Sequence, residues 1–251
     1  MILLIDADSL LYYSGFQDSE SEAKESLTKR LVEMCQQHNT NRFIAFLTKG
    51  SFRYNVAQTK PYKGNRKNTE KPPHYDALRK YATETLRFEV VENIEADDLV
   101  VYWHYNLGED NIICSPDKDV LYSVAGTHWN YKYFKNKDTN TVIKGSEVAV
   151  DTTTTMQFTY KQCIIGDSGD NIPGIKGLGT KKVDKLFEDC TTEDLCYKKC
   201  IDTFVEHYGI PQGFHIFLEM YRLVYILRSK EDITRELGFG LVKPAIRKIN
   251  Y

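Results

Sequence analysis

The chain has 251 residues, of which 41% are hydrophobic and 27% charged, enough for one large domain or two closely packed ones. Two aspartates interrupt the apolar stretch at residues 1–11, so we expect a cytoplasmic protein with neither a signal peptide nor a membrane helix. The net charge of −2 is compatible with a polyanionic partner, provided that positive charge is concentrated locally.

Strands and helices are predicted to alternate up to about residue 150. Short apolar runs predict buried strands at residues 2–5, 42–47, 88–91 and 111–115. The segments between them predict helices at residues 22–37, 72–86 and 95–105. This order favours a mostly parallel sheet flanked by helices.

The pattern changes after the fourth predicted strand. Residues 124–142 are rich in Tyr, Thr and Trp and contain turn residues, which predicts hairpin pairing. From residue 156 onward the pattern predicts helices joined by short loops. We therefore divide the chain into an α/β region, residues 1–155, and a helical region, residues 156–251.

Residues 49–73 form a basic segment that is rich in turn residues. Between residues 49 and 71, seven basic side chains accompany a single acid, a net charge of +6 in 23 residues. This composition predicts a long loop or mobile segment that grips a polyanion locally.

Nine carboxylates occur in four short groups, three of which follow predicted strands or open the next helix. Because the carboxyl ends of parallel strands meet at one edge of a sheet, these acids should converge there. Crowded carboxylates repel each other and resist ionisation, which oxygen-preferring cations such as Mg²⁺ or Mn²⁺ relieve. A single Asp-x-Asp is more often a turn or a helix cap. Four groups together favour a metal site, whose candidate ligands are Asp6, Asp8, Glu95, Asp97, Asp98, Asp117, Asp119, Asp167 and Asp170.

The spacing within one group also predicts orientation. Glu95 and Asp98 are three residues apart on a predicted helix and should share a face, with Asp97 turned partly aside.

Glycines recur at residues 164–179, in the segment I-I-G-D-S-G-D-N-I-P-G-I-K-G-L-G, directly before a predicted helix. Glycines let the backbone approach a ligand and expose N–H groups at a helix start, which favours phosphate binding without base readout. The alternative is an ordinary helix–turn–helix connection with solvated lysines. The candidate phosphate-binding residues are Gly174, Lys176, Gly177, Gly179, Lys181 and Lys182.

The six cysteines include no C-x-x-C pair. Cys190, Cys196 and Cys200 are close in sequence, but no fourth zinc ligand stands at a recognisable spacing. Reduced structural thiols are therefore the preferred interpretation.

Five stretches together resemble the 5′ nuclease family, which includes phage flap endonucleases and the N-terminal nuclease domain of bacterial DNA polymerase I. The stretches are L-I-D-A-D-S-L at residues 4–10, F-R-Y-N-V-A-Q-T-K-P-Y-K-G-N-R at 52–66, E-A-D-D-L at 95–99, S-P-D-K-D-V-L at 115–121 and G-D-S-G-D-N-I-P-G-I-K-G-L-G at 166–179. The resemblance implies a PIN-like α/β fold in which the basic segment arches over the active site. It also implies a helix-three-turn-helix motif at about residues 160–190 that binds the duplex backbone.

The resemblance further implies a structure-selective 5′→3′ exonuclease and flap endonuclease that acts on DNA with a free 5′ end. Two Mg²⁺ or Mn²⁺ ions would be held, directly or through water, by the carboxylates named above other than Asp8. A K⁺ ion would bind main-chain carbonyls of the helix-three-turn-helix. Lys63 and Arg66 would contact the scissile phosphate, Arg53 would help to bind DNA, and Tyr62 would stack on a base.

Two features depart from the family pattern. Many relatives carry an aspartate at the end of the second strand, where this chain has Thr48, whereas Asp8 stands where many relatives have a neutral residue. We hypothesise that Asp8 partly takes over the missing ligand role. The 31 residues between Lys63 and Glu95 are also few for a helical arch, so a compact arch or one ordered by DNA is expected.

Two other functions stay open at this point. One is an RNase H-like nuclease that removes RNA from RNA–DNA hybrids, which the glycine loop does not exclude. The other is a non-catalytic protein that binds branched DNA, although its acids would repel DNA unless metals were bound. We expect a stand-alone, monomeric enzyme of phage or bacterial type.

Overall fold

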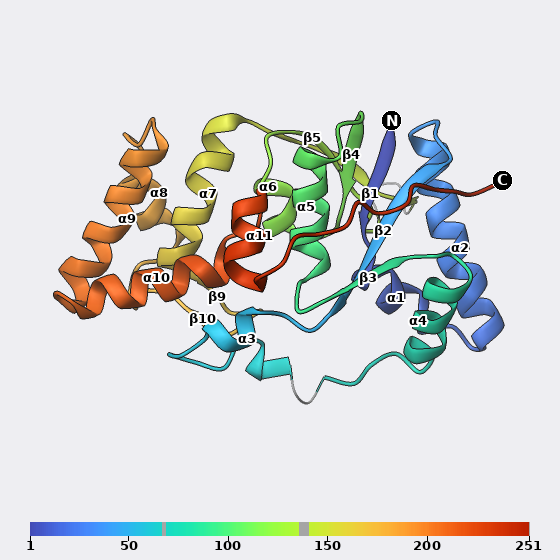
Figure 1. Ribbon diagram of the computed structural model, residues 1–251, viewed down its shortest axis with the longest axis horizontal. Coiled ribbons are helices and arrows are strands. Elements are labelled where there is room, and N and C mark those ends of the chain that lie inside the picture. The colour runs from blue at the N-terminus through green and yellow to red at the C-terminus, as the bar shows by residue number, and fades with distance from the viewer. Residues whose placement is uncertain (67–68, 136–140, 251) are drawn as a thin grey trace.

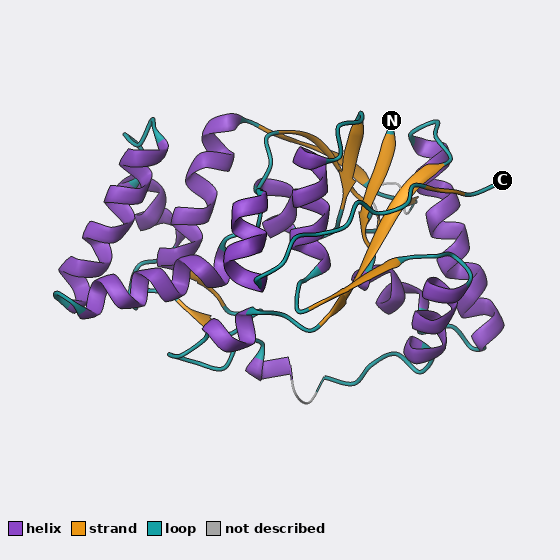
Figure 2. Cartoon of the chain, viewed as in Figure 1, coloured by secondary structure: helices purple, strands orange, loops and turns teal. Residues whose placement is uncertain are grey.

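The computed structural model describes residues 1–66, 69–135 and 141–250. Within these ranges a seven-stranded sheet is flanked by helices and continues on one side into a helical region (Figures 1 and 2). No helix in the described residues is both long and apolar enough to cross a bilayer. The strands of the sheet are β1 (Ile2–Asp6), β2 (Arg42–Lys49), β3 (Glu89–Glu92), β4 (Asn111–Cys114), β5 (Gly126–Asn130), β8 (Ser146–Val150) and β11 (Arg247–Lys248).

The sheet is mostly parallel, as predicted. β1 lies at its centre and pairs in parallel with β2 on one side and β4 on the other. β3 and β5 extend the parallel part outward, whereas β8 and β11 are antiparallel edge strands. β11 comes from the end of the predicted helical region, so the division at residue 155 does not describe these last residues.

The hairpin prediction for residues 124–142 is only partly right. β5 joins the main sheet, and the small hairpin forms between β6 (Phe134–Lys135) and β7 (Val142–Ile143). Residues 136–140 of the predicted hairpin, like residues 67 and 68 of the basic segment, lie outside the described ranges.

β1 is buried on both faces because its side chains alternate between two apolar layers. Leu3 and Ile5 pack with helices α1, α2 and α4, whereas Ile2 and Leu4 pack with α5 and the helical region. A continuous apolar run is the expected signature of such a doubly covered strand. The helices are α1 (Asp8–Ser14), α2 (Glu20–Gln37), α3 (Arg53–Val56), α4 (Tyr75–Glu84), α5 (Ala96–Asn106), α6 (Lys118–Tyr122), α7 (Thr152–Ile165), α8 (Thr180–Leu186), α9 (Glu193–Tyr208), α10 (Gln212–Val224) and α11 (Lys230–Leu237).

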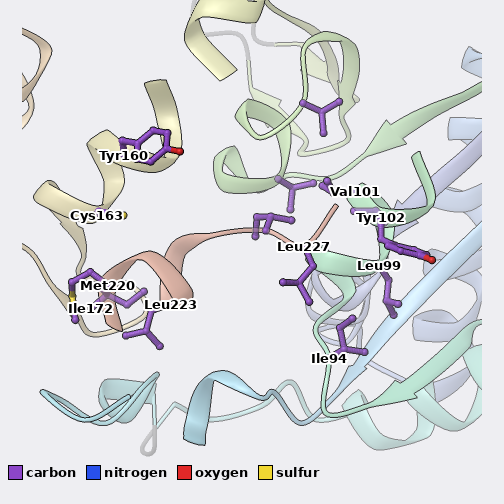
Figure 3. Packing of buried hydrophobic residues seen from close by; sticks show 14 of the residues in the cluster. Ile94, Leu99, Val101, Tyr102, Tyr160, Cys163, Ile172, Met220, Leu223 and Leu227 are labelled. Atoms are coloured by element: carbon purple, nitrogen blue, oxygen red, sulfur yellow. The ribbon is translucent and has the colours of Figure 1, made fainter. Parts of the chain in front are cut away.

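One apolar cluster joins the sheet to the helical region. It runs from Ile94 and Leu99 at α5 to Cys163 of α7 and Met220 of α10, with Leu227 between them (Figure 3). All six cysteines are free and buried, in agreement with the prediction of structural thiols. The two predicted regions therefore share a core.

The basic segment is more ordered than predicted. It contains the short helix α3 and a 3-10 turn, η1 (Gly64–Arg66), instead of one long loop. Glu219 of α10 accepts hydrogen bonds from the backbone N–H groups of Gln58 and Thr59, both at 2.7 Å. These contacts attach the described part of the basic segment to the helical region.

Candidate active site

The acid-rich segments meet at the carboxyl edge of the central strands. Asp6 ends β1, whose neighbour β4 ends at Cys114, one residue before Ser115. The helices α5 and α6 begin beside this edge, with Glu95 and Asp117 at their N-caps. Acids from distant segments therefore lie along one edge of the sheet.

Asp6, Asp97 and Asp117 form an inner group of acids that interact through their charges. Burial, reinforced by Asp8 and Asp117, raises the pKa of Asp6 to about 7. Burial and the charges of Asp6 and Asp117 likewise raise the pKa of Asp97. Shifts of this sign show that the carboxylates lack enough nearby positive charge, a deficit that a bound cation would remove.

Asp119 and Asp167 form an outer group at the start of α6 and the end of α7. Burial, followed by the charge of Asp117, raises the pKa of Asp119 to about 8, and Asp167 adds to the increase. Gln162 of α7 donates to Asp119 at 3.2 Å. Asp167 accepts from the backbone N–H of Gly169 at 2.6 Å, which fixes its carboxylate.

Two hydroxyl residues, which the sequence did not single out as site residues, hold these acids in place. The hydroxyl of Ser115 donates to Asp6 at 2.9 Å and accepts from the backbone N–H of Asp117 at 3.1 Å. The backbone N–H of Thr48 donates to Asp8 at 3.1 Å, and the Thr48 hydroxyl accepts from the N–H of Ala96 at 2.9 Å. Thr48 lies next to the last residue of β2, and Ser115 directly follows β4. Their position at strand ends is the sequence signal that could have identified them.

Lys63 lies among the acids, as the catalytic prediction requires. Its ammonium group forms an ion pair with Glu95 and lies 3.8 Å from Asp170. Burial alone would lower its pKa, but Glu95, Asp170 and Asp97 raise it, so Lys63 carries a full positive charge. Its φ of +53° is the left-handed conformation, which the surrounding contacts hold in place.

The base of the basic segment is fastened to the glycine loop. The backbone N–H of Lys63 donates to the carbonyl of Asp170 at 2.8 Å. The guanidinium of Arg66 donates to the Gly169 carbonyl at 3.0 Å and pairs with Asp170. Because the Arg66 side chain is still 54% exposed, it can reach a phosphate. Asn65 and Asn171 add amide hydrogen bonds across the same junction.

Arg53 is not available to DNA, contrary to prediction. Its residue is 1% exposed, and its guanidinium donates to Glu95 once and to Asp98 twice, at 2.6–3.0 Å. The remaining two N–H groups donate to the carbonyls of Leu223 and Tyr225. All five donors of the guanidinium are used inside the protein, so Arg53 ties α5 to the end of α10.

The same cluster changes the interpretation of Asp98 and Asp97. Asp98 is fully buried, and its oxygens accept from Arg53 and from the backbone N–H of Leu227 at 3.0 Å. Glu95 and Asp98 thus share a helix face as predicted, but that face binds Arg53. Asp97 is the residue that points to the inner acids. A metal-ligand role for Asp98 is therefore wrong in this structure.

Tyr62 is likewise buried, at 5% exposure. Its hydroxyl oxygen lies 2.8 Å from Glu95 and 2.9 Å from Asp170, so its single proton is shared between the two carboxylates. Its ring packs edge-on against Tyr54 at 5.5 Å. A buried ring offers no face to a base, so the predicted stacking role is not supported, whereas Tyr54 is 55% exposed beside it.

The glycine loop follows α7 as a small hairpin, β9 (Gly166–Asp167) with β10 (Ile172–Pro173), before α8. A side chain at Gly174 would lie 2.2 Å from the carbonyl oxygen of Ile165, so this glycine serves packing rather than ligand approach. Gly177 and Gly179 border open space, and Lys176 and Lys181 are exposed. The Lys182 ammonium donates to the Gly177 carbonyl at 2.9 Å.

Comparison with known proteins shows which proteins this chain is similar to. No model of a protein family matches it. DNA polymerase I of Caldicellulosiruptor bescii is 23% identical over 229 residues, which cover 78% of this chain and 25% of that protein. The 5′–3′ exonuclease of Buchnera aphidicola subsp. Acyrthosiphon pisum is 32% identical over 133 residues, which cover 49% of this chain and 44% of that protein. The chain is therefore similar in sequence, over part of their length, to proteins named DNA polymerase I and 5′–3′ exonuclease.

The chain spans less than half the length of these two relatives. A solved structure of the bacteriophage T5 flap endonuclease, in complex with DNA and metal ions, has the same fold. It aligns with a TM-score of 0.54 and 17% identity, covering 89% of this chain and 98% of that one. The fold is therefore PIN-like, with a mostly parallel sheet and a helical C-terminal part.

The acid groups of this chain have the chemistry that divalent cations prefer, but they do not form a preformed cage. Among the described residues no three His, Cys, Asp or Glu side chains form a ready-made cage for one ion. Mg²⁺ does not need such a cage, because it usually keeps several waters and takes one or two carboxylates. The raised pKa values of Asp6 and Asp119 and the all-oxygen donor set are the features that fit.

Proposed function

We propose that this chain is a metal-dependent 5′ nuclease that hydrolyses phosphodiester bonds of DNA at free 5′ ends, flaps and nicks. The observation that carries the proposal is the group of partly enclosed acids with raised pKa values, set directly beside the charged Lys63. Acids alone would repel DNA, whereas the same acids with cations, next to a lysine and an arginine, attract a phosphate.

Each group of residues would have a separate task. Asp6, Asp97 and Asp117 would hold one divalent ion, in part through water molecules, and Asp119 with Asp167 a second. When bound, such ions lower the pKa of a water molecule and offset charge on the reacting phosphate. Mg²⁺ or Mn²⁺ is proposed over zinc because all the donors are carboxylates.

Lys63 and Arg66 would stabilise the negative charge that develops on the phosphate. Lys63 is held by its ion pair with Glu95 and by the backbone bond to Asp170. It therefore meets the phosphate already oriented, which avoids reorganisation during the reaction. Glu95 forms ion pairs with Lys63 and Arg53 and so positions the lysine. It would not hold an ion together with the inner acids.

The glycine loop and α8 would bind the duplex backbone as a helix-three-turn-helix. Gly177, Gly179, Lys176 and Lys181 lie on an open surface, which supports contact with phosphates rather than bases. Binding should then fall steeply with salt concentration. A K⁺ ion held by main-chain carbonyls of this loop is part of the proposal.

A cleavage assay tests the proposal. Nicked duplexes, 5′ flaps and RNA–DNA hybrids, each labelled at the 5′ end, are incubated with the chain in Mg²⁺, Mn²⁺ or EDTA. We expect cleavage of the DNA flap and nick with either metal and none in EDTA. Cleavage of the hybrid alone would support an RNase H-like enzyme, and binding without cleavage in either metal would support a non-catalytic binder.

A pair of variants connects the assay to the acids. Asp117→Asn keeps the shape of the side chain and removes its charge, so cleavage should fall far more than DNA binding. Asp189→Asn makes the same change at an exposed position and should match wild type. If binding and cleavage fell equally in Asp117→Asn, the residue would have a structural role instead.

A further inference from the structure

A cavity that the proposed nuclease function does not use lies in the helical region, away from the acids. It has a volume of about 260 Å³ and is enclosed by α7, the first turn of α9 and the residues at the end of α10. Thr155 on its wall precedes Gln162, the α7 residue that contacts Asp119, by seven residues, or roughly 10 Å along the helix. The lining residues are Thr152, Thr155, Met156, Thr159, Tyr160, Glu193, Tyr221, Tyr225 and Arg228.

Stacked tyrosines form one side of this cavity. The rings of Tyr160 and Tyr221 are 5.9 Å apart at 28°, and those of Tyr221 and Tyr225 are 5.1 Å apart at 23°. The guanidinium of Arg228 lies 5.3 Å from the centre of the Tyr225 ring. The aromatic side of the cavity therefore ends in a positive charge.

Two polar groups in the cavity are buried without a partner. The hydroxyl of Thr155, a residue 8% exposed, has no hydrogen-bond partner among the described residues, and neither has Nε of Arg228. Within the same described ranges, no carboxylate lies within 4 Å of the Arg228 guanidinium, so its charge is unpaired. A buried polar group without a partner destabilises the protein, and a ligand with matching polar groups would satisfy it.

We propose that this cavity binds a nucleoside 5′-monophosphate. Arg228 would bind the phosphate, since guanidinium groups pair well with phosphate oxygens. Because the tyrosine faces are stacked on one another, a base would contact the ring edges that line the cavity. The hydroxyl of Thr155 suits the hydroxyl group of the sugar. The volume of about 260 Å³ lies slightly below the roughly 300–1,000 Å³ of small-molecule pockets, so a single nucleotide fits the space better than a dinucleotide.

This site is distinct from the proposed nuclease site. None of its lining residues belongs to the acid groups or to the basic segment. The test is therefore carried out in EDTA and without DNA, where no cleavage occurs. A chain that failed to cut DNA could still bind the nucleotide, and a chain that bound no nucleotide could still cut DNA.

Isothermal titration calorimetry with deoxyadenosine 5′-monophosphate measures the binding. We expect saturable binding, weakened by about tenfold or more in Arg228→Gln and several-fold in Thr155→Val, which keeps the shape but loses the hydroxyl. Arg87→Gln, at an exposed arginine, is the matched control and should bind as wild type does. Inorganic phosphate and deoxyadenosine should each bind more weakly than the complete nucleotide.

Two results would overturn the proposal. One is the absence of binding by the wild-type chain up to a nucleotide concentration of about 1 mM. The other is equal affinity in wild type, Arg228→Gln and Thr155→Val, with circular dichroism showing that the variants are folded. If Arg228→Gln does not fold, Thr155→Val alone decides, because it changes one oxygen for one methyl group.

Discussion

Replacing Arg53 with methionine would remove five hydrogen bonds and leave Asp98 without its cation. Asp98 is fully buried, and only the N–H of Leu227 would remain as a donor to its carboxylate. Breaking a buried ion pair by removing one partner costs about 3–5 kcal/mol, because the other charge stays uncompensated. That is a large share of a total stability of about 5–15 kcal/mol.

Urea unfolding followed by circular dichroism measures this loss. Arg87→Met, which changes an exposed arginine, should stay within about 0.5 kcal/mol of wild type. In the double variant Arg53→Met with Asp98→Leu, both charges are absent, so part of the stability should return. The coupling between the two positions should be about 2 kcal/mol.

The result that would refute this reasoning is a loss below about 1 kcal/mol in Arg53→Met. Arg53 would then not be needed to hold α5 against the end of α10, and a direct contact between Arg53 and DNA would again be tenable. A large loss of stability, with DNA affinity unchanged in the fraction that is folded, is the outcome that the buried geometry predicts.

Three further predictions concern the site. Lys63→Ala should lose most of the turnover on a 5′ flap while duplex binding persists, because Lys63 meets the phosphate and not the duplex; unchanged rates would exclude that role. Asp8→Asn should shift the metal concentration needed for half-maximal cleavage, and a metal dependence equal to wild type would refute the hypothesis that Asp8 replaces a missing ligand. Gly174→Ala should destabilise the fold by about 1–3 kcal/mol or more, because its new carbon would lie 2.2 Å from a carbonyl oxygen, and a melting temperature equal to wild type would contradict that packing.

Matched controls exist for two of these changes. Lys60→Ala removes an exposed lysine from the same basic segment and should cleave normally. Gly179→Ala adds a methyl group that borders open space, so it should cost less stability than Gly174→Ala.

Much of the fold could be predicted from local patterns. The strands at residues 2–5, 42–47 and 111–115 were found because each is a short apolar run ended by a polar residue. Their convergence at one sheet edge followed from parallel pairing, and it brought Asp6 next to Asp117. The edge strand β11 was missed because two residues carry no periodic signal, and only its partner β2 makes it a strand.

The pairing of charges could not be predicted in the same way. Sequence spacing placed Glu95 and Asp98 on one helix face but could not show that Arg53 would occupy it. Arg53 reaches that face because α3, which follows β2, lies beside α5. The carbonyls of Leu223 and Tyr225 at the end of α10 accept its remaining hydrogen bonds. Burial of an arginine depends on partners 40 or more residues away, which no local window contains.

The sequence by itself determined the alternation of strands and helices, the acid groups, the basic segment and the glycine loop, because these depend on residue type and short spacing. Only the tertiary structure decided which acids are paired with cations and which repel one another. In the folded chain Arg53, Asp98 and Tyr62 are buried, and Lys63 lies between Glu95 and Asp170. The physical reason is that charge balance and burial are set by neighbours in space, and those neighbours come from segments far apart in the chain.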